Sequence, residues 1–522
     1  MGDGTAASRR RATPPPFTSI VWPSSADDGR DIPAATLTEL ALDGVIEQVA
    51  PGRVSGDIAA LFRRMPRAIE TVTFRQGVLA DLDSSADARA AVEDFAIAMR
   101  EVRSALAPRV APDFREAQHA RFASAAIRYC AAVEAHRDAL IVARPASDGL
   151  RSWQTYLREY TSGGAFAELR ETARRVVDDV ARVEYGVKID GMTLTVLASL
   201  RGPTLGDQIE RTFARFRDGD AEPVAIETEP ASDTERLDQA IIERVARIHP
   251  RPFAALDAFV RRHSGFISDA VARFERDIRF YTEYLAFIRP LRAAGLEFCR
   301  PAVKARAGLR LRDSFDIAVA DRLVDEGRPV VVNDMDLAGR ERIAVVTGPN
   351  QGGKTTFARM VGQAHVLGAL GLLVPGTSAS IAMPDRVLTH FEREEDVADL
   401  RGKLEDDLRR AHEMMEGAGP SSVLIFNEVL TSTTLDDARD MGERILRRVI
   451  ERGSRCVFVT FVDELSTLDP SIVSLVCGVE KDDATRRTFR VERRPAEGLA
   501  YAAALAERYG LTYDALAKGR RR

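Results

Sequence analysis

The segment from Gly348 to Thr355 has the residue types and spacing of a phosphate-binding loop. It reads Gly-Pro-Asn-Gln-Gly-Gly-Lys-Thr and fits the pattern G-x-x-x-x-G-K-[ST] at every fixed position. Glycines let successive backbone N–H groups turn toward a phosphate, and the N-terminus of a following helix attracts the same anion. We therefore expect Lys354 to reach the β- and γ-phosphates of a nucleotide and Thr355 to offer its hydroxyl to Mg²⁺.

The residues on both sides of this loop agree with that interpretation. The apolar run from Arg342 to Thr347 predicts a buried strand, and Thr356 to Val361 predicts the start of a helix. A plain glycine turn between a strand and a helix is the alternative, but the strand-loop-helix context favours a nucleotide site. The residues expected to bind ATP in this segment are Gly348, Pro349, Asn350, Gln351, Gly352, Gly353, Lys354, Thr355 and Thr356.

A second polar segment supplies the expected catalytic half of the site. The apolar run Val423 to Phe426 predicts a strand, and Asn427 and Glu428 follow it directly, where the common pattern is Asp-Glu. We expect Glu428 to orient the attacking water, Lys354 to act with it, and Asn427 to join Thr355 at Mg²⁺. Asn427 lacks the charge of an Asp, so weaker Mg²⁺ binding and slow turnover are predicted. A solvated Glu at an ordinary strand end is the alternative.

The composition describes an ordinary globular protein. The chain has 522 residues, 45% of them hydrophobic and 29% charged, with a net charge of −5, so any contact with DNA must be a local patch. About three domains fit this length. The cysteines lack the spacing of zinc ligands, and the sequence has neither a membrane-spanning run nor a signal core. These features predict a reduced, cytoplasmic protein without a membrane partner.

The pattern along the chain changes twice. Residues 1–32 are polar and Pro-rich and predict a disordered tail, whereas residues 33–300 predict helices. Within the helical part, residues 183–197 predict a small β unit, a hairpin turning at Asp190-Gly191, and residues 216–236 predict an acidic loop. A long helix from Phe253 to Ala294 should break near Pro290. Residues 301–522 alternate strands and helices, which predicts an α/β domain with a largely parallel sheet.

Three segments of the α/β part resemble the DNA mismatch repair MutS-related ATPase family. Thr347 to Thr356 is similar to its phosphate-loop signature, Asn427 to Thr433 to its Asp-Glu segment, and Thr460 to Leu465 to its Thr-His-x-x-Glu-Leu segment. Weaker similarity extends to Gly295–Pro301 and Leu37–Val49. The resemblance implies an ABC-type P-loop ATPase domain preceded by an all-α core and lever domain, in a short form without the mismatch-recognition domain.

The resemblance also implies partners and further site residues. Two ATPase domains would form a homodimer with composite ATP sites, and the lever would transmit the nucleotide state to DNA. Val331, within residues 330–333, falls where the family lines the adenine, and Lys403 begins the helix that contacts the partner's nucleotide. Basic residues that could meet DNA phosphates, or be paired within the chain, are Arg300, Lys304, Arg306, Arg310 and Arg312.

Three positions depart from the family pattern. Asn427 replaces the usual Asp, Leu404 lies in the segment that contacts the partner's nucleotide, and Phe461 occupies the place of the switch His. These departures support two hypotheses. The first is a slowly hydrolysing ATPase, with ATP and Mg²⁺, that couples nucleotide state to DNA binding as a homodimer. The alternative is a non-catalytic, ATP-dependent dimerisation switch that recruits a protein partner.

Overall fold

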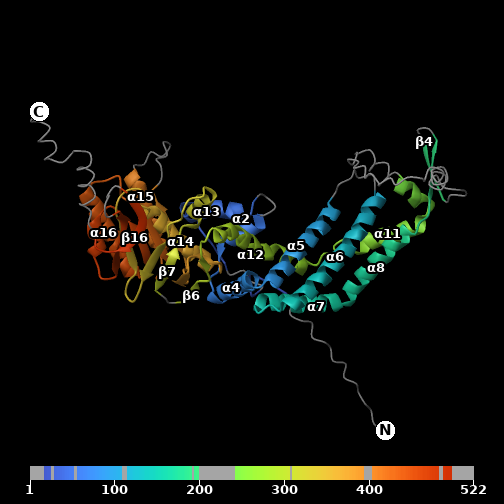
Figure 1. Ribbon diagram of the computed structural model, residues 1–522, viewed down its shortest axis with the longest axis horizontal. Helices are drawn as coiled ribbons and strands as arrows, with labels where there is room; N and C mark the ends of the chain where they lie inside the picture. Colours follow the sequence, from blue (N-terminus) through green and yellow to red (C-terminus); the bar gives the residue numbers. More distant parts are fainter. Residues whose placement is uncertain are drawn as a thin grey trace, which may run out of the picture. The chain divides into compact units, whose positions relative to one another are not determined.

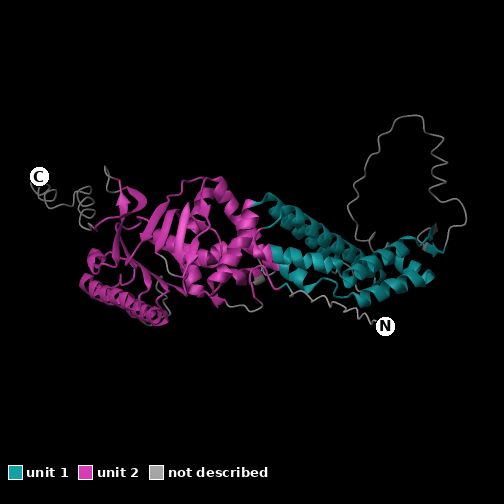
Figure 2. Ribbon diagram, turned by 90° about the horizontal axis from the view of Figure 1, so that it is seen from below, with its two compact units in different colours: residues 1–17, 85–145, 151–275 teal, residues 18–84, 146–150, 276–522 magenta. Residues whose placement is uncertain are grey.

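A computed structural model describes residues 17–24, 29–51, 56–107, 115–190, 193–198, 241–305, 308–392, 403–480 and 486–496. The chain divides into two compact units, coloured separately in Figure 2. Unit 1 comprises residues 1–17, 85–145 and 151–275, and unit 2 comprises residues 18–84, 146–150 and 276–522.

Unit 1 is built from long helices that run side by side (Figure 1). Stacked aromatic rings form part of its core: Trp153 lies parallel to Phe274 at a centroid distance of 4.2 Å, and Phe95 stacks on His136 at 4.3 Å. Its elements are α5 (Ala86–Leu106), α6 (Arg115–Ala143), α7 (Asp148–Ser162, from Arg151), α8 (Gly164–Ala181), β3 (Gly186–Asp190), β4 (Thr193–Leu197), α11 (Pro250–Arg262) and the first turns of α12 (Asp269–Ala293).

Two sequence expectations for the helical region have different outcomes. The hairpin is present, because β3 and β4 pair antiparallel from Gly186–Leu197 to Asp190–Thr193. The break near Pro290 is wrong: α12 continues through Pro290, and the interruption lies between Arg262 and Asp269. Pro290 lies in the last turn of α12, where little helix remains to be disturbed. The acidic loop expected at 216–236 lies outside the described residues.

Unit 2 contains the α/β part. Its strands are β1 (Arg30–Asp31), β2 (Arg64–Met65), β5 (Phe298–Cys299), β6 (Ala302–Lys304), β7 (Leu309–Ser314), β8 (Asn333–Leu337), β9 (Ile343–Thr347), β10 (Val374–Pro375), β11 (Ser378–Ala382), β12 (Val387–Phe391), β13 (Val423–Asn427), β14 (Arg455–Val459), β15 (Ile472–Val479) and β16 (Arg487–Arg493). Its helices are α1 (Ala34–Glu39), α2 (Leu42–Val49), α3 (Gly56–Phe62), α4 (Ile69–Ser84), α13 (Ile317–Asp325), α14 (Lys354–Ala369), α15 (Lys403–Gly417), α16 (Leu435–Arg452), the 3-10 helix η3 (Asp463–Thr467) and the rest of α12.

The main sheet of unit 2 positions the candidate site. Its strand order is β12-β13-β14-β9-β15-β16, parallel throughout except for β16, which pairs antiparallel with β15. The core strands β9 and β13 are buried along their whole length, as continuous apolar runs predict for parallel strands. Since the strands are parallel, the ends of β9 and β13 lie on the same edge. A second sheet, β6-β11-β7-β8, is mixed.

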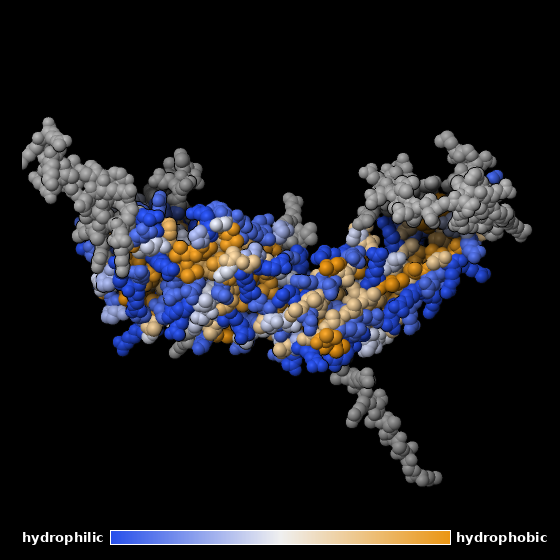
Figure 3. Space-filling model, in the orientation of Figure 1, coloured by the Kyte–Doolittle hydropathy of each residue, from blue (hydrophilic) through white to orange (hydrophobic). Residues whose placement is uncertain are grey.

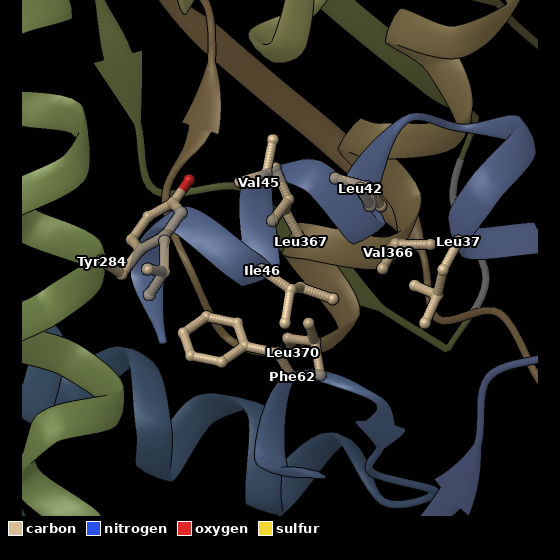
Figure 4. Close-up of a pocket in the computed structure, with 10 residues that line it drawn as sticks. Leu37, Leu42, Val45, Ile46, Phe62, Tyr284, Val366, Leu367 and Leu370 are labelled. Atoms are coloured by element: carbon tan, nitrogen blue, oxygen red, sulfur yellow. The ribbon is translucent and has the colours of Figure 1, made fainter. Parts of the chain in front are cut away.

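Helices from the beginning of the chain pack on α14. Figure 4 shows Leu42, Val45 and Ile46 of α2 against Val366, Leu367 and Leu370. The approach is close at Gly362, where a β-carbon would lie 2.4 Å from the Leu40 side chain. Residues 18–84 therefore group with the α/β part, and the division of the chain differs from the boundary expected at residue 300.

Part of the segment expected to be a disordered N-terminal tail is folded into unit 2. Ile20 and Val21 are buried in unit 2, where Ile20 O accepts a hydrogen bond from Tyr281 at 2.6 Å and Val21 O accepts one from Arg75 at 3.0 Å. The reason is local composition, because the short apolar run after the prolines has enough surface to join a core. Residues 1–16 lie outside the described part.

The surface in Figure 3 is mostly hydrophilic, with apolar side chains in smaller groups. Large apolar side chains exposed in unit 2 are Leu408, Leu435, Phe461 and Phe489. In the described part of the chain, no helix combines the length and apolar character needed to cross a membrane.

Candidate nucleotide site

The segment between β9 and α14 has a backbone that requires glycine. Gly348 and Gly353 have φ angles of 121° and 95°, a region that L side chains rarely adopt. A β-carbon on Gly352 would lie 2.9 Å from Pro349 O. Gln351, which is exposed, also has a positive φ of 60°. The loop is therefore a tight turn that leads directly into the first turn of α14.

Lys354 lies folded over this loop. Its Nζ donates to Gly348 O at 3.1 Å, Pro349 O at 3.2 Å and Asn350 Oδ1 at 3.2 Å, and its side chain is 4% exposed. The same Nζ lies 3.3 Å from Glu428 Oε1. The loop after β9 and the loop after β13 thus meet through one ion pair, although β14 separates their strands.

Two oxygens at this sheet edge have no hydrogen-bond partner among the described residues. Asn427, 4% exposed, ends β13, and its Oδ1 accepts no hydrogen bond from the described residues. The hydroxyl of Thr347, at the end of β9, likewise has no hydrogen-bond partner among the described residues. A buried polar atom without a partner costs free energy, so these oxygens are suited to an external ligand. Thr355 and Thr356 are half-buried in the first turn of α14.

Glu428 stands on a backbone of unusual conformation. Its φ is 54°, and its N–H donates to Val459 O of β14 at 3.1 Å. Leu430, two residues later, has a φ of 66°. Left-handed conformations of residues other than glycine cost about 1–2 kcal/mol and concentrate at functional sites. Glu428 is half-exposed, so its carboxylate is accessible to solvent.

Two residues of β16 that were not predicted from the sequence lie beside the loop. Phe489, 47% exposed with a φ of 56°, has its ring 3.6 Å from the position of a β-carbon on Gly353. Arg487 donates to Asn350 O at 3.2 Å. An exposed aromatic ring therefore lies beside the loop, and it comes from a different segment than residues 330–333.

Cys477 of β15 lies directly below the loop. Its atoms are 3.1 Å from the position of a β-carbon on Gly348, and burial raises the pKa of its thiol to about 11. All four cysteines of the chain are free. In the described residues, no group of His, Cys, Asp and Glu has the arrangement of a metal cluster.

Other expected residues are less directly connected to this site. Val331 is half-buried, two residues before β8, whose first residue Asn333 donates to Phe489 O at 3.1 Å. Leu404 packs against the hydrophobic cluster that includes residues of β13 and α16. Phe461 is 46% exposed after β14. The side chain of Lys403 lies outside the described part.

The basic residues expected near 300–312 are partly neutralised within the chain. Arg312 donates to Asp336 at 2.6 Å, and Arg310 lies 3.8 Å from the same carboxylate. Arg300 and Lys304 are exposed, and Arg306 lies outside the described residues. This segment is therefore a mixed-charge surface.

Comparison with known proteins identifies a matching family model and several relatives. Residues 344–511 match the family model of MutS domain V. The DNA mismatch repair protein MutS of Chlorobium phaeovibrioides is 26% identical over 238 residues, covering 45% of this chain and 26% of the relative. MutS of Symbiobacterium thermophilum is 30% identical over 206 residues, covering 39% of this chain and 23% of the relative. The chain thus spans about a quarter of the length of the curated relatives it matches.

Proposed function

We propose that this MutS-related chain is an ATPase that binds ATP with Mg²⁺, hydrolyses it slowly and couples nucleotide state to DNA binding as a homodimer. Residues 301–522 would form an ABC-type P-loop ATPase domain, and the helical region before them a core and lever. The ion pair between Lys354 and Glu428 carries the proposal, because it joins the two halves of the expected site.

The residues at the sheet edge fit a magnesium-bound triphosphate. Backbone N–H groups of the loop from Gly348 to Gly353 would hold phosphate oxygens, and Lys354 would exchange its carbonyl acceptors for them. Thr355 and Asn427 would hold Mg²⁺, and the orphaned Oδ1 of Asn427 supports this assignment. When bound, Mg²⁺ neutralises negative charge on the transferred phosphoryl group.

Base binding would use the β16 side of the loop. Phe489 offers an exposed ring beside Gly353 for stacking, and Asn333 holds the backbone of that residue in place. Arg487 would add positive charge near the phosphates. Val331 belongs to the segment that would line the adenine from the β8 side.

Hydrolysis would depend on Glu428. Its half-exposed carboxylate would orient the attacking water once Lys354 has turned toward phosphate. Slow turnover is proposed because Asn427 brings no negative charge to the metal and Phe461 cannot serve as a polar switch residue. Both departures act on rate more than on ATP affinity.

The DNA and dimer parts of the proposal have separate support. The matched relatives are named DNA mismatch repair proteins, and Leu435 and Phe461 expose apolar surface on segments that follow β13 and β14. Such residues are suited to an interface between two ATPase domains. Duplex and branched DNA should bind with an affinity that falls as salt rises, and no binding at low salt would remove this part.

The test of the enzyme proposal compares three purified proteins. Wild type should bind ATP and release phosphate, Lys354→Ala should lose ATP binding, and Glu428→Gln should bind ATP but hydrolyse it at least tenfold more slowly. A wild-type protein that neither binds nor hydrolyses ATP would refute the proposal.

A second function is favoured by Asn427 and the exposed Phe461. In this alternative, ATP closes a dimer that recruits a protein partner without hydrolysis. Equal sedimentation shifts with ATP for wild type and Glu428→Gln, combined with no phosphate release by either, would select the switch over the enzyme.

A further inference from the structure

A buried polar pair lies behind the loop that carries Glu428. His390 of β12 is fully buried, and its Nε2 lies 3.3 Å from Oδ1 of Asp407 on α15. Asp407 itself is 6% exposed. Burying a carboxylate costs several kcal/mol unless it is paired and hydrogen-bonded, so the position of Asp407 requires an explanation.

The second oxygen of Asp407 contacts the backbone of the Glu428 loop. Oδ2 accepts a hydrogen bond from the N–H of Leu430 at 3.4 Å. Leu430 has a φ of 66° and Glu428 a φ of 54°, so the carboxylate contacts a turn with two left-handed residues. Such conformations persist when their surroundings fix them, and Asp407 is a polar contact that does so.

The strand that carries His390 also borders this loop. His390 pairs in register with Phe426, and Glu392 N–H donates to Asn427 O at 3.3 Å. Glu392 further accepts from the Thr431 hydroxyl at 3.1 Å. The end of β12 and the side chain of Asp407 therefore contact the segment 427–431 from two elements.

We propose that Asp407, which lies against His390, is a positioning residue that fixes the 428–430 turn and so orients the Glu428 carboxylate toward the attacking water. The inference rests on the proposed hydrolysis. Misplacing a catalytic group by about 1 Å can cost on the order of 100-fold in rate, so the backbone anchor should matter for turnover more than for ATP binding.

The test uses the full chain with substitutions at two neighbouring positions of α15. Asp407→Leu removes the acceptor and keeps a side chain branched at Cγ, and Asp407→Asn keeps one carbonyl oxygen for Leu430. Asp406→Asn is the matched control, because Asp406 is paired with Arg409 at 2.6 Å and is more exposed. Steady-state kinetics give kcat and KM, and a fluorescent ATP analogue gives Kd.

We expect Asp407→Leu to lower kcat at least tenfold with ATP Kd changed less than about threefold. Asp407→Asn should recover most of the lost kcat, and Asp406→Asn should match wild type. A kcat for Asp407→Leu within twofold of wild type would overturn the inference. So would equal losses in Asp407→Leu and Asp407→Asn.

Amide hydrogen exchange tests the positioning role of Asp407 without relying on ATP turnover. Peptides covering residues 423–434 should exchange faster in Asp407→Leu than in wild type, while peptides of α14 keep their protection and thereby show that the unit is folded. Unchanged exchange at 423–434 would refute the positioning role even in a protein without ATPase activity. Glu428→Gln, measured in parallel, separates this outcome from failure of the proposed hydrolysis. Should Asp407→Leu fail to fold, Asp407→Ala, which removes the acceptor without adding volume, provides the same two readouts.

Discussion

Acidification is expected to destabilise unit 1 through His136. The buried ring donates from Nδ1 to Ala91 O at 2.9 Å and accepts the indole N–H of Trp153 on Nε2 at 3.0 Å. This arrangement uses the neutral ring, since a protonated one could not accept from Trp153. Burial lowers the pKa of His136 from 6.5 to about 3.

The size of the effect follows from that shift. Between about pH 6.5 and pH 3 the unfolded chain binds a proton at His136 and the folded chain does not. The stability that the neutral ring contributes is therefore fully present above pH 6.5 and is lost as the pH falls toward 3. Each pH unit in this window costs about 1.4 kcal/mol, and the whole window about 5 kcal/mol.

Tryptophan fluorescence gives a selective assay. The chain has 2 tryptophans, so the Trp22→Phe background leaves Trp153 as the reporter of unit 1. Urea unfolding between about pH 4 and pH 6 should show an unfolding free energy that rises with pH, with a slope that His136→Gln reduces by about 1.4 kcal/mol per pH unit, because glutamine keeps a donor and an acceptor but does not titrate. Identical slopes for parent and variant would refute the reasoning.

Three further predictions concern unit 2. Asn427→Asp should lower the Mg²⁺ concentration for half-maximal phosphate release about tenfold, equivalent to about 1.4 kcal/mol, because a charge is added at the metal; no change would exclude Asn427 as a ligand. Phe489→Ala should raise ATP Kd about tenfold through lost stacking, whereas Tyr185→Ala, an exposed aromatic of unit 1, should leave it unchanged. Gly362→Ala should lower stability by about 1–3 kcal/mol in thermal unfolding through overpacking, with Gly164→Ala, which meets open space, as the control.

The sequence predicts those elements whose capping residues and apolar patterns match the structure that they form. The pattern from Leu435 to Arg452 predicts a helix, and α16 has those bounds, because Thr434 caps its first turn and Gly453, with a φ of 73°, ends it. Strands β9 and β13 appear in the sequence as continuous apolar runs, since both faces of a parallel strand are covered. The phosphate loop and Asn427-Glu428 follow from these strands.

The rest depends on contacts between distant segments. Periodicity indicates that residues 34–49 form helices, but it does not indicate that they pack on α14. Strand β11 reads Ser-Ala-Ser-Ile-Ala and has no clear apolar pattern. It is stabilised by pairing with β6 on one side and β7 on the other, which the sequence of β11 alone does not indicate. Phe489 reaches the phosphate loop only because β15 and β16 form a hairpin. The one sequence feature that could have indicated this role is the phenylalanine within the mostly polar strand β16, Arg487–Arg493.

The position of Cys477 has a consequence for measuring the motion of the phosphate loop. A buried thiol with a pKa of about 11 reacts with thiol reagents at neutral pH only when its surroundings open. Since Cys477 lies against Gly348 and Gly352, its labelling rate reports the fraction of molecules in which the loop has lifted from β15. In the triple variant that keeps only this cysteine, the ratio of folded to free-thiol labelling rates gives the opening free energy of the loop. Labelling of Cys477 therefore measures the loop opening that would let a nucleotide enter.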